Sequence, residues 1–328
     1  MPTNRNDDLV VDAVITWVDG NDTVWQKKLN EYAEVKIDFK IKEQSVRFNS
    51  VGEIDIAIKS IIKFAPFIRN IFLVTDNQKP ASFDALKKIA DKNEINLSIV
   101  DHKIVFEGYE DYLPSFNSRS IATVLHRIPN LSEHFIIFND DTFLMRSTKF
   151  SDYFISGYPI LRGDWKNFYE DQVFRKLYYK CISFFGFQKK ENKAGFKKAM
   201  QVSAKLAGAS RYIRRFHTPI PIRKSTIEDF FLKHNLLENN IKHRFRNDEQ
   251  FLVESLATHL EVKNDTFFYT KDTQLTYFRS YKRPKEVKLK LANFLTDKRK
   301  LFVTFQSLEM ADEKTLQYIL SWIDNRIK

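Results

Sequence analysis

Apolar and polar positions alternate along the first half of the chain in segments that predict strands and helices in turn. Four apolar runs rich in β-branched and aromatic residues are expected to be buried strands, at 9–18, 68–75, 96–100 and 134–138. Three segments have the apolar spacing of a helix face, at 52–65, at 83–92 and from a cap at Ser115 or Asn117 to Ile128. Strands that alternate with helices in this way are typical of a mainly parallel α/β sheet.

Polar side chains follow three of the predicted strands. They are Asp19 and Asp22 after the first strand, Asp76 and Asn77 after the second, and Asn139, Asp140 and Asp141 after the fourth. Ligands of parallel sheets bind just beyond the carboxyl ends of the strands. Turns also favour Asp and Asn, so one such residue says little. Three acidic strand ends in one half of the chain predict a shared binding site.

The adjacent pair Asp140 and Asp141 suggests a cation site. Hard cations such as Mg²⁺ take one or two carboxylates together with phosphate oxygens, so the pair is a candidate anchor for a diphosphate and its Mg²⁺. Neighbouring side chains of a strand point to opposite faces. Both carboxylates can therefore face one ligand only if the backbone turns after the fourth strand.

Two basic clusters lie later in the chain. Residues 211–224 place His217 among four arginines and one lysine, and residues 242–249 include Arg246. Cations lower the pKa of a nearby histidine and favour the neutral imidazole, which can accept a proton. The planar fork of arginine matches phosphate oxygens. Taken one at a time, however, such residues are more often structural or merely exposed.

Composition separates residues 165–216 from the rest. This segment holds 13 Lys or Arg and 3 Asp or Glu, interleaved with aromatic residues. Basic amphipathic helices that rest on an anionic membrane have this composition. Solvated basic helices that pack their aromatic residues inward have it too.

The formal net charge of +11 favours polyanionic partners, namely nucleic acid, phosphorylated substrates or an anionic membrane. No helix-turn-helix, zinc-ligand spacing or RNA-binding motif supports nucleic acid. Cys181 is the only cysteine, so no internal disulfide can form, and neither a secretory signal nor an apolar run of about 18 residues is present. We expect a cytoplasmic protein, with peripheral contact at the inner face of the plasma membrane as a variant of this location.

The C-terminal part is expected to pack on the core. Residues 301–305 predict a strand, and a helix from about Asp312 carries one apolar face made of Leu316, Ile319, Leu320, Ile323 and Ile327. We therefore expect a single catalytic domain over 1–328, with a basic, aromatic-rich helical insertion at 165–216 and a C-terminal strand and helix at 285–328 that cover the core.

Four blocks of the chain together resemble the sequence blocks of the Stealth phosphotransferases. The blocks are 11–25 (VDAVITWVDGNDTVW), 46–80 (with APFIRNIFLVTDNQ), 113–144 (with HRIPNLSEHFIIFNDD) and 216–251 (with FHTPIPIRK and HRFRNDEQF). They occur in the order of the family. The resemblance implies a fold like that of A-type glycosyltransferases and an Mg²⁺ cofactor, with Mn²⁺ as the alternative.

The resemblance also implies a reaction. An acceptor hydroxyl attacks the phosphorus that is bonded to the sugar of a nucleotide-sugar donor, with UDP-hexose or UDP-N-acetylhexosamine expected, and UMP leaves. The acceptor is expected to be an oligosaccharide or a lipid-linked sugar of a capsule or exopolysaccharide. A glycosyltransferase that releases UDP and a non-catalytic basic protein that binds nucleic acid or membrane are the alternatives; nucleic acid is not the expected partner.

Residue roles are implied in the same way. Asp140 and Asp141 hold the metal and diphosphate, with Asp141 the favoured direct ligand. His217 is the general base, Asp19 is the alternative base, and Arg246 stabilises the transferred phosphoryl group. The substrate-binding candidates are Asp76, Asn77, Arg47, Asn117, Ser118, Arg211, Arg214, Lys224 and Asn139.

Overall fold

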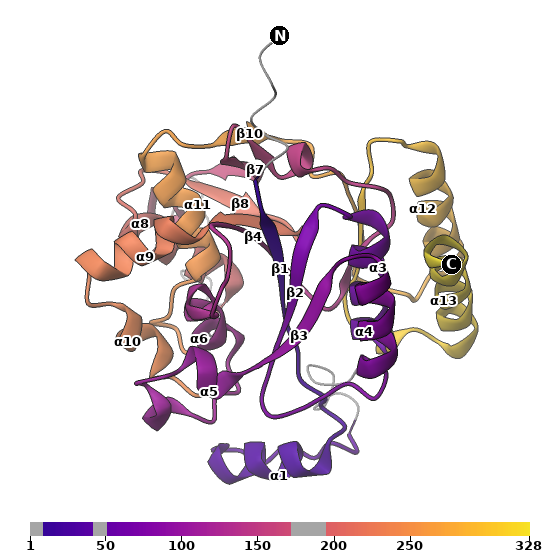
Figure 1. The fold of residues 1–328 in the computed structure, drawn as a ribbon, viewed down its shortest axis with the longest axis horizontal. Coiled ribbons are helices and arrows are strands. Elements are labelled where there is room, and N and C mark those ends of the chain that lie inside the picture. The colour runs from indigo at the N-terminus through magenta and orange to yellow at the C-terminus, as the bar shows by residue number, and fades with distance from the viewer. Residues whose placement is uncertain (1–8, 42–50, 172–194) are drawn as a thin grey trace, which may run out of the picture.

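A five-stranded sheet forms the centre of the computed structural model, which describes residues 9–41, 51–171 and 195–328. Its strand order is β3-β2-β1-β4-β9. The strands are β1 (Val11–Thr16), β2 (Ile68–Thr75), β3 (Asn96–Asp101), β4 (His134–Phe138) and β9 (Ile220–Arg223). The first four are parallel, and β9 runs antiparallel at the edge beside β4. The expected mainly parallel sheet is confirmed (Figure 1).

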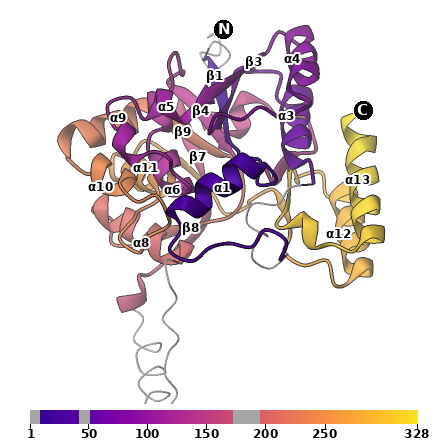
Figure 2. The ribbon, with the colours of Figure 1, turned by 90° about the horizontal axis from the view of Figure 1, so that it is seen from below.

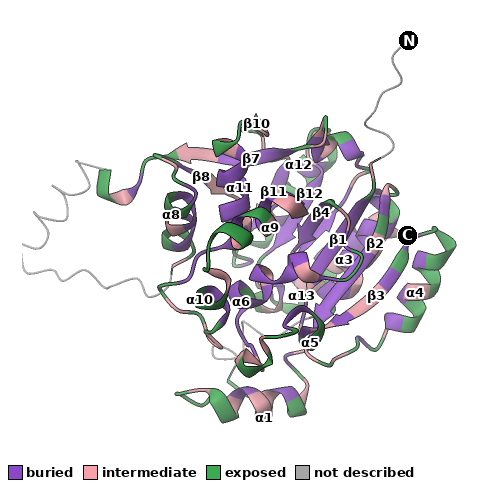
Figure 3. Cartoon of the chain, turned by 60° about the vertical axis from the view of Figure 1, so that its left-hand side comes forward, coloured by how far each residue is buried: buried purple, intermediate pink, exposed green. Residues whose placement is uncertain are grey.

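Helices cover both faces of this sheet. On one face lie α3 (Glu53–Phe64) and α4 (Phe83–Lys92); on the other lie α5 (His102–Val105), α6 (Ser118–Thr123), α9 (Lys224–Lys233), α10 (Leu237–Ile241) and α11 (Val253–Lys263). Each face of the sheet packs against its helices in a hydrophobic core, and strand β1 contributes to both cores. Ala13 and Ile15 pack with α3 and α4, whereas Val14 packs with α6 and α11. Burial on both faces explains why these strands are continuous apolar runs (Figure 3).

Two elements differ from the expectation. Helix α1 (Thr23–Tyr32) begins where a loop was expected; Asp22 caps it by accepting from the Val24 amide at 2.8 Å. Its periodic signal is weak because only Trp25 and Leu29 are buried. The helix capped by Asn117 is shorter than expected, ending at Thr123 before a 3₁₀ turn at Leu125–Arg127. Figure 2 shows α1 crossing the sheet at the carboxyl ends of its strands.

A second sheet joins the middle of the chain to its C-terminal part. It contains β5 (Thr142–Leu144), β12 (Phe302–Phe305) and β11 (Leu275–Phe278). Strand β12 is antiparallel to β5 and parallel to β11. Helices α12 (Pro284–Thr296) and α13 (Glu313–Ile327) enclose a core that also includes Ala57 of α3. The expected C-terminal helical cover is thus present, and Asp312 caps α13.

The basic segment 165–216 contains both strand and helix. A third sheet holds β6 (Phe154–Ile155), β7 (Tyr158–Lys166), β8 (Tyr212–Arg215) and β10 (Phe268–Thr270), and helix α8 (Phe196–Leu206) precedes β8. Residues 172–194, with Cys181, lie outside the described residues. Within the described ranges, no helix is both long and apolar enough to cross a membrane. The remaining 3₁₀ turns are Glu110–Tyr112, Phe150–Asp152, Tyr169–Asp171 and Leu308–Met310.

Candidate active site

The carboxylates that follow β1 and β2 form a compensated cluster, made of Asp19, Asp22 and Asp76 with Lys28 and Gln78. Lys28 Nζ lies 2.6 Å from Asp76 Oδ2. Gln78 Nε2 donates to Asp22 Oδ2 at 3.0 Å and to the Asp19 carbonyl at 3.1 Å. The hydrogen bond from Gln78 is the largest of the effects that lower the pKa of Asp22. The structure brings these predicted residues together, and most of their charge already has a partner within the protein.

Asn77 connects the same cluster to β3. Its φ of 54° places it in the left-handed region, which asparagine tolerates better than most residues. The backbone N–H of Asn77 donates to Asp101 Oδ2 at 2.7 Å. The turn after β2 therefore depends on the backbone of Asn77, while the side chain remains available to a ligand.

Asp140 and Asp141 follow β4 and are called the uncompensated cluster here, because no described Lys, Arg or His forms an ion pair with either. Burial, followed by the charges of Asp141 and Glu53, raises the pKa of Asp140 to about 7. Burial also raises the pKa of Asp141, and a hydrogen bond from Thr142 opposes that shift. Among the described residues, no Lys, Arg or His forms an ion pair with Asp140 or Asp141.

The donor set of this cluster fits a divalent cation that is shared with a ligand. In the described part of the chain, no group of three or more His, Cys, Asp or Glu could hold a metal by itself. Mg²⁺, however, is commonly held by one or two carboxylates plus substrate phosphates. A cation here would relieve the repulsion that raises the pKa of Asp140. Asp140 and Asp141 are thus suited to Mg²⁺ or Mn²⁺ only together with phosphate oxygens.

Two buried threonine hydroxyls connect Asp141 to His217. Thr142 Oγ1 lies 3.2 Å from Asp141 Oδ1 and 2.8 Å from Thr304 Oγ1, and Thr304 Oγ1 donates to the His217 carbonyl at 2.8 Å. Thr142 donates to Asp141, which is why this contact opposes the raised pKa of that carboxyl. The backbone of His217 is thereby fixed relative to the uncompensated cluster.

The imidazole of His217 lies between two aromatic rings. Its centroid is 5.1 Å from Tyr277 at 22° and 6.2 Å from Phe196 at 18°. Stacking uses the faces of the ring and leaves its edge, which carries both nitrogens, available for proton transfer. Burial, then Arg215 and Arg279, lowers the pKa of His217, so the neutral form dominates near pH 7.

The C-terminal strands contribute residues to the site that sequence reasoning did not identify. Tyr277 lies at β11, Arg279 directly follows this strand, and the Tyr281 hydroxyl donates to the Gln306 carbonyl at 2.9 Å. Asp141 contributes to the raised pKa of both tyrosines, after burial as the main cause. The run YFRSYKRP, from Tyr277 to Pro284, combines aromatic and cationic residues and was the available signal.

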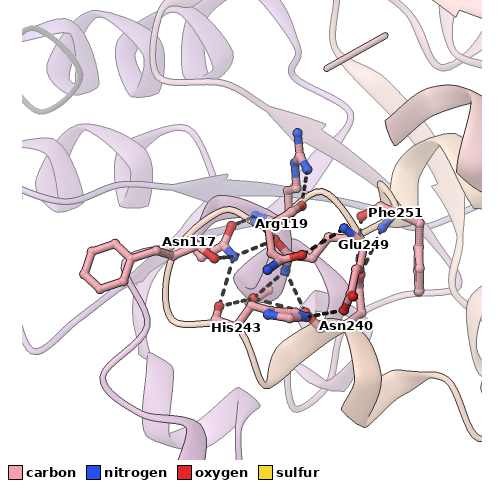
Figure 4. A network of polar contacts seen from close by, with 10 residues as sticks. Asn117, Arg119, Asn240, His243, Glu249 and Phe251 are labelled. Carbon is pink, nitrogen blue, oxygen red and sulfur yellow. Dashed lines mark hydrogen bonds and ion pairs between the residues drawn. The ribbon is translucent and has the colours of Figure 1, made fainter. Parts of the chain in front are cut away.

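A separate polar network around Asn117 and His243 joins α6 to the segment that carries Arg246 (Figure 4). Arg246 donates to Ser118 Oγ at 2.9 Å. Asn117 caps α6, and its amide donates to the carbonyls of His243 and Phe245, each at 2.9 Å. Asn117 is completely buried, so the expectation that it contacts substrate is corrected: its side chain positions the loop that carries Arg246.

Three predicted cations have other environments. Arg214 lies 2.6 Å from Asp164 across the β7–β8 pair, and Arg211 lies over the Trp165 ring at 5.8 Å. Lys224 follows Arg223, which pairs with His134 at the amino end of β4. Lys224 is therefore at the opposite end of this strand from Asp140, and we correct its expected place in the site.

The other two substrate-binding candidates are Asn139 and Arg47. Asn139 follows β4 directly, is partly exposed and accepts from the Thr142 amide through its carbonyl at 3.2 Å. This places it beside the uncompensated cluster. Arg47 lies outside the described residues.

Comparison with known proteins agrees with the first three of the four blocks. The profile of Stealth protein CR1, conserved region 1, matches residues 10–34, and that of Stealth protein CR2, conserved region 2, matches residues 47–159. The second and third blocks, expected as separate units, therefore lie within one conserved region.

Curated relatives carry phosphotransferase names. The chain is 40% identical over 150 residues to "Capsular polysaccharide phosphotransferase fcs1" of Haemophilus influenzae, which is 45% of this chain and 39% of the relative. It is 38% identical over 145 residues to "Receptor polysaccharide phosphotransferase WefC" of Streptococcus oralis, 44% of this chain and 41% of the relative. The chain thus matches about two fifths of the length of these relatives.

Solved structures with a loosely similar course of the chain include glycosyltransferases. The bifunctional glycosyltransferase WbbM has a TM-score of 0.48 at 10% identity, covering 97% of this chain and 50% of that one. The galactosyltransferase LgtC has a TM-score of 0.44 at 9% identity, covering 96% of each chain. At these scores no residue role transfers between the proteins. The sequence matches are the informative ones: the chain carries segments similar to conserved regions 1 and 2 of Stealth proteins.

Proposed function

We propose that this protein transfers a sugar 1-phosphate from a nucleotide-sugar to the hydroxyl of an acceptor sugar during synthesis of a capsular polysaccharide or exopolysaccharide. The observation that carries the proposal is the link from Asp141 through Thr142 and Thr304 to His217. It joins one of two carboxylates suited to a diphosphate to the backbone of His217, whose imidazole is suited to accept a proton. The phosphotransferase names of the relatives agree with this chemistry.

In the proposed step, the acceptor oxygen forms a bond to the phosphorus that carries the sugar. The bond from that phosphorus to the oxygen bridging the two phosphates breaks, and the nucleoside monophosphate leaves with that oxygen. The acceptor proton goes to the neutral His217. Asp140 and Asp141 would hold Mg²⁺, which when bound supplies charge neutralisation for the diphosphate. The C1–O bond of the sugar is retained.

The general base is assigned to His217 in preference to Asp19. The nitrogens of His217 accept no hydrogen bond from the described residues, and burial with two nearby arginines keeps the ring neutral. Asp19 Oδ1 already accepts from the Asn21 amide at 2.9 Å, and its backbone is joined to Gln78. An aspartate that shapes a turn is better suited to positioning the donor.

The test is to identify the nucleotide that is released. The purified protein is incubated with UDP-hexoses or UDP-N-acetylhexosamines, Mg²⁺ and a polysaccharide-precursor acceptor. We expect UMP, together with a product whose sugar remains bonded to phosphate. UDP as the released nucleotide would show attack at C1 of the sugar, and the proposal would be rejected. Boiled protein and reactions without acceptor are the controls for chemical hydrolysis.

A further inference from the structure

We propose that Arg279 is a phosphate-binding residue of this site, supplied by the C-terminal strands. The inference rests on the proposed function insofar as it names the ligand as the diphosphate of a nucleotide-sugar. Arg279 lies outside both matched conserved regions and outside the two basic clusters of the sequence. Four observations support the assignment.

The first is the backbone path from the carboxylates to Arg279. The Phe305 amide donates to the Asp141 carbonyl at 3.0 Å, and Phe305 of β12 pairs with Phe278 of β11. Adjacent strands lie about 4.8 Å apart, so the backbone after Phe278 is roughly 10 Å from that of Asp141. Arg279 is the next residue, and its side chain is long enough to share a diphosphate with the carboxylate pair.

The second is that Arg279 has no carboxylate partner. None of the ion pairs between described residues includes it, and its side chain is exposed. By contrast, Arg283 lies 2.7 Å from Glu286, and Arg214 lies 2.6 Å from Asp164. A guanidinium that forms no ion pair with a described carboxylate is available to an anion.

The third is that the guanidinium is held in place. It lies over the Tyr277 ring at 4.9 Å, and this ring stacks on His217. Phe196, His217, Tyr277 and Arg279 thus form consecutive layers. This cation–π contact and a side-chain hydrogen bond with Tyr277 orient the guanidinium and leave most of its N–H donors for a ligand.

The fourth is electrostatic. Arg279 is close enough to contribute to the lowered pKa of His217, after burial and Arg215. Its charge therefore reaches the proposed base. A cation in this place opposes protonation of His217 until a phosphate neutralises it. Bound phosphate is then expected to make the imidazole a better proton acceptor.

The test measures binding of inorganic pyrophosphate to the full chain in Mg²⁺ by calorimetry. We expect Arg279→Ala to weaken binding about 10- to 100-fold, the usual effect of losing hydrogen bonds to a charged group. Arg279→Lys should bind pyrophosphate with an affinity between those of the wild type and Arg279→Ala, because lysine keeps the charge but lacks the planar array of N–H donors of arginine. Arg283→Ala is the matched control: it removes the same charge four residues away, where Glu286 already binds it, and should change affinity less than about threefold.

Turnover separates failure of this inference from failure of the proposed function. If the wild type releases UMP and Arg279→Ala both binds pyrophosphate and turns over like the wild type, Arg279 has no such role. Equal losses in Arg279→Ala and Arg283→Ala would also reject it, because they indicate general charge attraction. If no UDP-sugar yields UMP, the proposed function fails, while pyrophosphate binding still decides the role of Arg279. Unchanged thermal unfolding of each variant confirms that it folds.

Discussion

Two groups of carboxylates lie at the carboxyl edge of the same sheet, and they differ in what surrounds them. In the compensated cluster, Asp76 has Lys28, and Asp22 has Gln78. In the uncompensated cluster, burial and the charges of Asp141 and Glu53 raise the pKa of Asp140 to about 7. The ends of the strands predicted both groups of carboxylates. The difference is that the first group has partners within the protein, whereas Asp140 and Asp141 form no ion pair with a described residue and are suited to bind a cation.

Removing one carboxylate from the uncompensated cluster is expected to have the largest effect. Asp141→Asn keeps the size of the side chain and removes its charge, so release of UMP should fall about 10³-fold at saturating donor. Asp22→Asn, the matched change in the compensated cluster, should cost less than about tenfold, because Gln78 can hydrogen-bond to the amide oxygen. Similar losses in the two variants would contradict the distinction drawn between the clusters.

His217→Ala is expected to come next. Loss of a general base lowers kcat by about 10²-fold or more. The wild type should lose activity as the pH falls through a pKa below the usual histidine value, because protonated His217 accepts no proton. The variant should lack this acidic limb when kcat is measured against pH. If the limb persists in His217→Ala and disappears in Asp19→Asn, Asp19 is the base.

Breaking the ion pair of the compensated cluster should affect stability more than catalysis. Lys28→Met leaves Asp76, whose side chain is 12% exposed, without its cation, and should lower the free energy of unfolding by about 1–3 kcal/mol. We expect kcat to change less than about tenfold. Denaturant unfolding and UMP release, measured on one preparation, give both values. A large loss of kcat with unchanged stability would place Lys28 on the substrate.

The smallest expected effect has the opposite sign. Asp140→Asn should raise the free energy of unfolding at pH 8 without metal, by about 1 kcal/mol or more. The folded-state pKa of Asp140, about 7, exceeds the ordinary value of 3.8 for this side chain, so the folded state binds an extra proton between these pH values. The free energy of unfolding of the wild type therefore falls as the pH rises from 4 to 7. The gain should vanish as the pH approaches 4, and a gain independent of pH would refute this explanation.

The sequence predicted the first sheet well and the complete site only in part. Strands such as β2 and β4 are local apolar runs, and Asp140 and Asp141 were found because they end one of them. The third sheet was missed, and segment 165–216 was expected to be helical where the structure has β8. Tyr277 and Arg279 could not be placed because their position depends on pairing between β5, β12 and β11.

The contact between Thr142 and Thr304 spans 162 residues of sequence. During synthesis, the first four strands can pair long before β12 leaves the ribosome, whereas β5 has no partner until then. Loop closure over such a separation is also slow compared with local folding. Assembly of the site is therefore a late event in the life of each molecule, and a nascent chain with a finished central sheet would still be inert toward its substrates.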